Sequence, residues 1–168
     1  MGLNYDADKA HYIASTCIII KDGKYLLTKR SSKEKAFPGK WTVPGGKFEA
    51  KDYDGRKHDT DGAKQWYNVM EDSIRREVLE ETGLRIKDIG YVTSLVFVRK
   101  DGIPTMVISY YAQHDSGAVI LSDELDEYAW VTAEEAKDYD LIDGIWEEID
   151  MLDRMLKGGK IGEWKKKD

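Results

Sequence analysis

The nine residues from 76 to 84, R-E-V-L-E-E-T-G-L, combine the residue types best suited to chemistry in this chain. Glu77, Glu80 and Glu81 stand three and four positions apart, so on a helix their like-charged carboxylates would crowd onto one face. Carboxylate oxygens on one face suit Mg²⁺, which keeps several waters and is shared with the phosphates of a substrate. A solvated acidic face is the alternative. The chance that a chain of this length anywhere contains one Arg, three Glu and one Gly at these spacings is on the order of one in ten thousand, taking each residue type at about 5–7%. We therefore favour a cation site.

The segments before this stretch must place it against a loop. Apolar, β-branched runs at 13–20 and 25–29 predict two strands joined by a tight turn, with Gly23 at positive φ. Residues 37–46 predict a loop, a short strand and a second loop, the last being the turn P-G-G-K. Residues 50–67 are rich in Asp, Lys and Gly, so we interpret them as an inserted surface loop.

A helix is predicted from 69 to 82. Asn68 and Glu71 have the spacing of a capping pair at its start, and Gly83 is the expected stop. Arg76 and Glu80 are four apart and can pair, which would hold one carboxylate in place. On this helix Ile74 and Val78 are expected to face the core.

The second half of the chain predicts further strands and two helices. Strands are expected at 91–99, 105–113 and 128–131, with an acidic loop before the third. Thr132 and Glu135 form a capping box that opens a short helix. A last helix near 143–156 would bury four apolar side chains at helical spacing, namely Ile145, Ile149, Leu152 and Leu156.

Composition limits the class of protein. With 168 residues, 41% apolar and 35% charged, the chain is expected to form one globular domain. A net charge of −6 argues against a binder of nucleic-acid polymers, which works by neutralising phosphates. Cys17 is the single cysteine, in an apolar run, and is expected to be a buried thiol. The chain has no apolar run long enough to cross a membrane and no secretory signal pattern, so a cytoplasmic location is expected.

The double glycine and the acidic stretch together resemble the Nudix box, the loop–helix–loop signature of the Nudix hydrolases. That pattern is Gly, five residues, Glu, seven residues, then Arg-Glu-apolar-x-Glu-Glu-x-Gly-apolar. Counting back eight from Arg76 gives Asn68 where the family has its first Glu, and about sixteen extra residues separate Glu49 from that point. Gly46 matches the opening glycine, and the second half is matched by Arg76, Glu77, Val78, Glu80, Glu81, Gly83 and Leu84.

The resemblance implies an α/β/α sandwich with a mixed β-sheet. The whole chain, 1–168, would be a single Nudix hydrolase domain with the inserted loop at about 50–67 inside the box. The implied reaction is metal-dependent hydrolysis of the pyrophosphate bond in a nucleoside diphosphate linked to another moiety. A nucleoside triphosphate, an ADP-ribose type and a nucleotide sugar all remain open. A catalytically silent domain that binds a nucleotide or a partner as a sensor is the alternative. By analogy with relatives, a homodimer is possible.

The resemblance also implies roles for particular residues, with Mg²⁺, or Mn²⁺, as the cofactor. Glu77, Glu80, Glu81 and the carbonyl of Gly45 are expected metal ligands, and Arg76 belongs to the same catalytic group. Glu124, in the acidic loop before Trp130, is the expected general base and a further metal ligand, with Asp123, Asp126 and Glu127 as competitors. Expected substrate-binding residues are Lys47, Arg30, Trp41 and Trp66. For the carboxylate missing at Asn68, the sequence leaves several substitutes open: Glu71, Glu49, Asp52, Asp54, Asp59 and Asp61. Otherwise the metal would bind less tightly.

Overall fold

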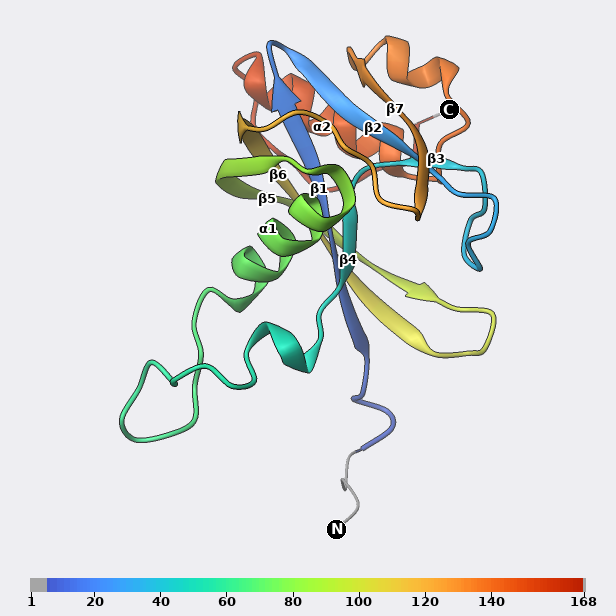
Figure 1. Ribbon diagram of the computed structural model, residues 1–168. Coiled ribbons are helices and arrows are strands. Elements are labelled where there is room, and N and C mark those ends of the chain that lie inside the picture. The colour runs from blue at the N-terminus through green and yellow to red at the C-terminus, as the bar shows by residue number, and fades with distance from the viewer. Residues whose placement is uncertain (1–5, 168) are drawn as a thin grey trace.

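The computed structural model describes residues 6–167, which form a mixed β-sheet with short helices on both of its faces (Figure 1). The sheet order is β3-β2-β1-β6-β5, with β4 paired to β1 and β7 paired to β2. β1 and β6 run parallel, and the other pairs are antiparallel. The strands are β1 (Tyr12–Lys21), β2 (Lys24–Arg30), β3 (Trp41–Thr42), β4 (Gly45–Lys47), β5 (Arg85–Val98), β6 (Pro104–Ser116) and β7 (Leu125–Val131). The helices are α1 (Val69–Thr82) and α2 (Ile145–Leu156), with the 3₁₀ turns η1 (Ala50–Asp52) and η2 (Glu135–Asp138).

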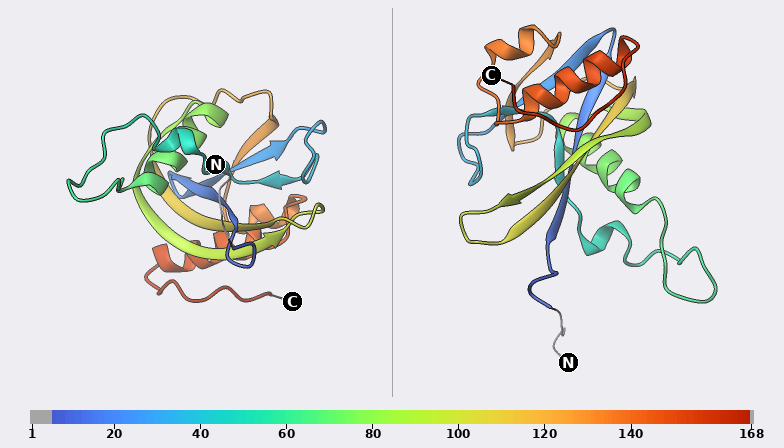
Figure 2. Two further views of the ribbon diagram at one scale, coloured as in Figure 1. Left: turned by 90° about the horizontal axis from the view of Figure 1, so that it is seen from below. Right: turned by 180° about the vertical axis from the view of Figure 1, so that it is seen from behind.

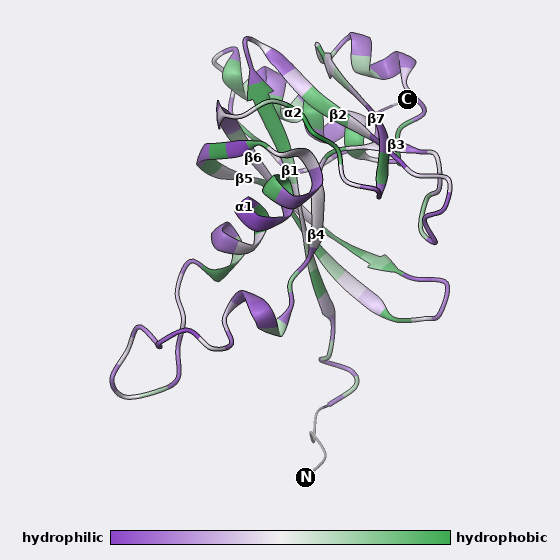
Figure 3. Cartoon of the chain, in the orientation of Figure 1, coloured by the Kyte–Doolittle hydropathy of each residue, from purple (hydrophilic) through white to green (hydrophobic). Residues whose placement is uncertain are grey.

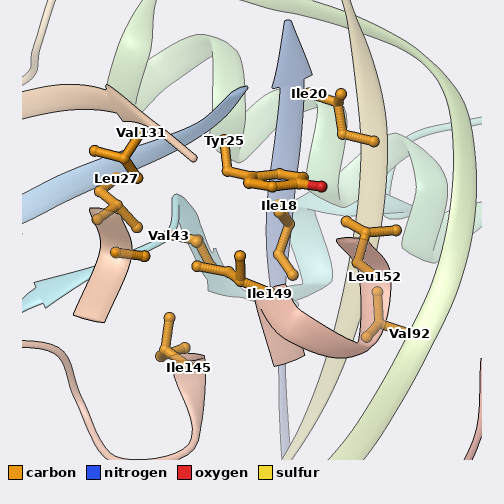
Figure 4. Close-up of a cluster of buried hydrophobic side chains, with 11 residues drawn as sticks. Ile18, Ile20, Tyr25, Leu27, Val43, Val92, Val131, Ile145, Ile149 and Leu152 are labelled. Atoms are coloured by element: carbon orange, nitrogen blue, oxygen red, sulfur yellow. The ribbon is translucent and has the colours of Figure 1, made fainter. Parts of the chain in front are cut away.

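The two α-helices cover opposite faces of the sheet (Figure 2). Side chains alternate along a strand, so β1 supplies both faces. Cys17 and Ile19 pack with Ile74 and Val78 of α1. On the other face, Ile18 and its neighbours pack with α2 in the cluster drawn in Figure 4. The predicted α/β/α sandwich with a mixed sheet is confirmed.

Apolar residues concentrate in the central strands, whereas the insert and the outer helix faces are polar (Figure 3). Cys17 is fully buried, as expected. Among residues 6–167, every helix is too short or too polar to cross a membrane.

Several boundaries and one cap differ from the prediction. β5 begins at Arg85 and not near Tyr91, because bulges in its pairing with β6 let the chain bend and keep pairing. β7 begins at Leu125, three residues early. The capping pair at Asn68 is wrong: Asn68 has φ 57 and its side chain makes no cap hydrogen bond. In contrast, Thr132 and Glu135 do exchange hydrogen bonds, at 2.8 and 3.2 Å.

The inward face of α2 should carry much of the stability. Ile149 is fully buried in the cluster shared with β1 and β2, whereas Leu156, predicted to be buried, is 46% exposed because the helix ends there. We expect Ile149→Ala to lower the free energy of unfolding by about 2–4 kcal/mol through lost contacts and a residual cavity. Leu156→Ala is the control and should cost less than about 1 kcal/mol. Urea denaturation measures both, and equal losses would contradict this packing.

Candidate cation and phosphate site

The double glycine was predicted to form a turn, and this prediction is wrong. Gly45 and Gly46 lie in the extended strand β4, paired with Thr16 and Ser15 of β1. Because they lack side chains, β1 and the Glu77 side chain of α1 can approach their backbone closely. A Cβ on Gly45 would stand 2.2 Å from the carbonyl oxygen of Ser15, and one on Gly46 would stand 2.1 Å from the carboxyl carbon of Glu77. The glycines therefore allow α1 to bring its carboxylates against the backbone of β4.

Arg76 connects the acidic side chains around this contact. Its guanidinium contacts Glu77 at 2.8 Å and Glu80 at 2.9 Å, so the predicted pairing with Glu80 is confirmed. It also contacts Asp52 at 2.7 Å and donates to the carbonyl oxygen of Lys47 at 3.4 Å. One planar cation with five donors thus joins α1 to η1 and β4.

Asp52 is the site residue that counting back from Arg76 missed. Its carboxylate is 2% exposed and accepts from Arg76, from the hydroxyl of Ser73 at 3.2 Å and from the backbone N–H of Glu49 at 2.8 Å. Burial opposes its charge, but Arg76 holds the pKa of Asp52 below its usual value.

Counting forward from Gly46 identifies the same residue. Five residues separate Gly46 from Asp52, which is the family spacing with Asp in place of Glu. Between Asp52 and Arg76 lie 23 residues where the pattern has seven, so the sixteen extra residues follow Asp52. Residues 50–67 are therefore not all surface loop, because η1 carries a buried carboxylate. Asn68 is exposed at the start of α1 and has no part in this network.

Glu81 and Glu124 meet at the other end of the acidic face. The Glu81 carboxylate accepts from the backbone N–H of Gly45 at 2.9 Å. The loop before β7 is hydrogen-bonded to the end of α1, because the N–H of Ser122 donates to the carbonyl oxygen of Glu81 at 2.9 Å. Ser31 then donates its N–H to the carbonyl oxygen of Glu124 at 2.8 Å. The exposed Glu124 side chain is thereby held near Glu81.

The surroundings of Glu81 and Glu77 make ionisation of their carboxyl groups unfavourable. Burial raises the pKa of Glu81 to about 8, the negative charges of Glu77 and Glu124 add to this shift, and the N–H of Gly45 opposes it. Burial also raises the pKa of Glu77, although Arg76 opposes the shift. Charged forms of both groups are therefore disfavoured until a positive charge arrives.

A hard divalent cation fits this donor set. Glu77, Glu80, Glu81 and Glu124 offer only oxygen ligands, and a cation would offset the like charges that raise the two pKa values. Over residues 6–167, no three acidic, His or Cys side chains converge as a ready metal site. Arg76 pairs with Glu77 and Glu80, and the N–H of Gly45 donates to Glu81, so these carboxylates already have protein partners. A bound cation would have to draw them together.

The predicted substrate residues divide into two groups. Arg30 lies close enough to Glu81 to lower its pKa, and it is held by Glu34 at 3.0 Å. Lys47 is exposed beside Gly46. The two tryptophans make other contacts: Trp41 packs edge-on to Tyr139, and Trp66 packs on Tyr53 inside the insert, donating to the carbonyl oxygen of Arg56 at 3.1 Å.

Comparison with known proteins identifies the family. The sequence profile of the NUDIX domain matches residues 11–152, most of the chain. The chain belongs to the Nudix family. Among relatives, the nucleoside triphosphatase NudI of Klebsiella pneumoniae (strain 342) is 28% identical over 134 residues, covering 74% of this chain and 84% of NudI. NudI of Salmonella agona (strain SL483) is 32% identical with the same coverage. This Nudix protein is therefore a pyrophosphohydrolase.

Solved structures share the Nudix fold. A MutT protein from Methanosarcina mazei Go1 has a TM-score of 0.64 and 25% identity, covering 89% of this chain and 98% of that one. The NUDIX domain of Shewanella oneidensis NrtR, solved as a complex with ADP ribose, has a TM-score of 0.66 at 20% identity. It covers 91% of this chain and 94% of that one.

The Arg76–Asp52 pair should stabilise the fold above acidic pH. We expect Asp52→Asn to lower the free energy of unfolding at pH 7 by about 2–4 kcal/mol, because it leaves part of a largely buried guanidinium unpaired. The folded-state pKa of Asp52 is depressed, so the pair contributes above the unfolded-state pKa of about 3.9 and is lost as pH falls through the folded value. The variant and the native protein should therefore converge below that pH in urea melts. Asp61→Asn, at an exposed carboxylate of the insert, is the control.

Substitution of the two glycines of β4 should have different effects, on activity for Gly46 and on stability for Gly45. Gly46→Ala meets the movable end of the Glu77 side chain, so we expect near-native stability and a loss of kcat/KM of about a hundredfold. Gly45→Ala meets the backbone of Ser15 and should unfold more easily. Gly62→Ala, with open space around it, is the control for both. Thermal melts with hydrolysis assays measure the effects, and an active Gly46→Ala would contradict the role of close approach.

Proposed function

We propose that this Nudix protein is a Mg²⁺-dependent hydrolase of a nucleoside triphosphate, cleaving a pyrophosphate bond in the triphosphate chain. The observation that carries the proposal is the packing of Glu77 and Glu81 against the side-chain-free backbone of Gly45 and Gly46, with Glu124 beside them. The choice among substrate classes follows the curated relatives, which are nucleoside triphosphatases.

The residues divide the work by their positions. Glu77, Glu80, Glu81 and Glu124 would hold the cation, Mg²⁺ or Mn²⁺, together with the carbonyl of Gly45. When bound, the cation neutralises phosphate oxygens and lowers the pKa of water. Arg76 is a positioning residue, because its partners are the carboxylates themselves. Arg30, beside Glu81, and the exposed Lys47 are placed to contact phosphate oxygens.

Glu124 is the general base in this proposal. It stands on an exposed loop tied at its backbone to both α1 and β2, and it is the carboxylate with least protein pairing near Glu81. It accepts a proton from the attacking water while the bond to the leaving phosphate breaks. Glu127, a competitor from the same loop, is already paired with Lys29 at 2.6 Å.

Asp52 argues against a catalytically silent domain. That alternative depended on Asn68 leaving the box without its first carboxylate. Asp52 supplies a carboxylate to Arg76 at the spacing counted from Gly46, so the argument from a missing acid no longer applies.

The substrate class is tested by a panel of triphosphates, dinucleoside polyphosphates, ADP-ribose and nucleotide sugars with Mg²⁺ or Mn²⁺. Both products of each reaction should be identified. We expect triphosphates to be cleaved at the highest kcat/KM and activity to disappear with chelator. Preference for ADP-ribose or a sugar nucleotide would overturn the substrate assignment, and no turnover of any compound would overturn the function.

The base assignment has its own test. Glu124→Gln should lower kcat by about a hundredfold or more while KM stays within a few-fold, because the amide keeps an oxygen for the cation but cannot accept the proton of the attacking water. Asp123→Asn and Asp126→Asn, its exposed neighbours, are the matched controls and should stay near the native rate. A large loss in either control with an active Glu124→Gln would move the base to that neighbour.

A further inference from the structure

Glu148 is a buried carboxylate that the proposed hydrolysis does not use. It lies in the first turns of α2, faces the sheet and is only 2% exposed. The hydroxyl of Ser109 of β6 lies close enough to lower the pKa of Glu148, but the Oε2 atom of Glu148 has no hydrogen-bond partner among residues 6–167. An unpaired buried oxygen of this kind costs free energy. A carboxylate is thus kept where an apolar residue would pack at lower cost.

A line of polar groups connects Glu148 to the phosphate site. Thr16 of β1 pairs with Gly45 of β4 on one side. On its other side Thr16 pairs with Ser109 of β6, and the Thr16 hydroxyl donates to the Ser109 hydroxyl at 3.2 Å. Two strand spacings make the in-sheet separation between β4 and Ser109 about 10 Å. Glu148 lies on the α2 face of the sheet and the carboxylates of α1 lie on the other face, so a nucleotide whose phosphates lie at Gly45 would reach Glu148 around the edge of β4, which pairs only with β1 among residues 6–167.

Beyond α2, no other helix among residues 6–167 covers the same face of the sheet, and we call this part the uncovered face (Figure 2). β5 and β6 continue past the end of that helix (Figure 2). Thr93 of β5 pairs with Ser109, and Leu95, two residues further along β5 and on the same face, is 40% exposed. Phe97 follows on the same face and contacts Phe37 of the loop after β2, with ring centroids 5.4 Å apart.

The loop that carries Phe37 starts at the phosphate site. Arg30, near Glu81, donates from its side chain to the carbonyl oxygen of Ala36 at 2.7 Å. Phe37 itself has φ 50, a conformation that bulky residues rarely adopt, so its ring is placed at a cost. The uncovered face thus has Glu148 at its inner end and an aromatic pair at its outer end.

The chemistry of Glu148 defines what it would recognise. Burial raises its pKa to about 7, so at pH 8 it is mostly a carboxylate, which can only accept hydrogen bonds. Guanine, hypoxanthine, uracil and thymine carry a ring N–H on their pairing edge. Adenine and cytosine present a ring nitrogen lone pair there, which a carboxylate repels.

We propose that Glu148 selects the nucleobase, its free oxygen accepting the ring N–H of a keto base that lies on the uncovered sheet face. This specificity role rests on the proposed triphosphatase function. It predicts that GTP and UTP are better substrates than ATP and CTP.

The test compares kcat/KM for these four triphosphates at pH 8 in the native protein and in Glu148→Gln. We expect a native preference for GTP over ATP and for UTP over CTP of at least about tenfold. The glutamine amide both donates and accepts, so both ratios should fall by about tenfold or more in the variant. Glu147→Gln, on the same turn but partly exposed, should keep the native ratios. Equal losses for all four substrates, or unchanged ratios, would overturn the proposal.

A second measurement needs no variant. In 1-methyl-GTP the ring N–H is replaced by a methyl group, whereas ITP keeps the ring N–H and lacks only the exocyclic amine. The native protein should cleave ITP about as well as GTP and 1-methyl-GTP at least about tenfold less well, and equal rates for all three would reject the assignment.

Calorimetry with GMP and AMP separates the base selection by Glu148 from the proposed triphosphatase function. Tighter GMP binding without any triphosphate turnover would reject the hydrolase and keep the base selection, and the reverse result would do the opposite.

Discussion

The site depends on one cation of the protein itself, the guanidinium of Arg76. Carboxylates of Glu77 and Glu80 share one side of α1, where mutual repulsion would turn them toward solvent. Arg76 contacts both and also Asp52, so a single side chain fixes α1, η1 and the end of β4 relative to one another. The raised pKa of Arg76, due to Asp52 and Glu77 in spite of its burial, reflects this surplus of negative charge.

This arrangement also explains how the Nudix box tolerates sixteen extra residues. Asp52 is fixed before the insertion and α1 begins immediately after it, so the chain between them closes a loop whose two ends are already in place. The entropic cost of lengthening such a loop grows only with the logarithm of its length. The insert adds its own packing, with Tyr53 on Phe48 on one side and on Trp66 on the other.

The sequence predicted those parts of the fold in which local signals agree. α1 has its predicted limits, because an amphipathic run ends at Gly83, which takes φ 71. The hairpin at Gly23 and the sandwich were also predicted. The nature of β4 was not, because glycine usually signals a turn, and only the neighbouring strand and helix show that close approach requires it here. Glu148 could not be singled out either. In the sequence Glu148 looks like an ordinary exposed residue of α2, and only the packing of that helix on strands distant in the sequence shows that it is buried.

The link between Ser122 and the last turn of α1 gives the loop before β7 a mechanical dependence on the helix. The N–H of Ser122 caps a carbonyl of the same residue, Glu81, whose carboxylate is bound by β4. Unwinding that single turn would release Glu81 from the strand and remove the hydrogen bond between α1 and the loop, leaving Glu124 held through Ser31 alone. The position of the base therefore depends in part on the helix that carries the acidic ligands, and fraying at this end of α1 would disturb both.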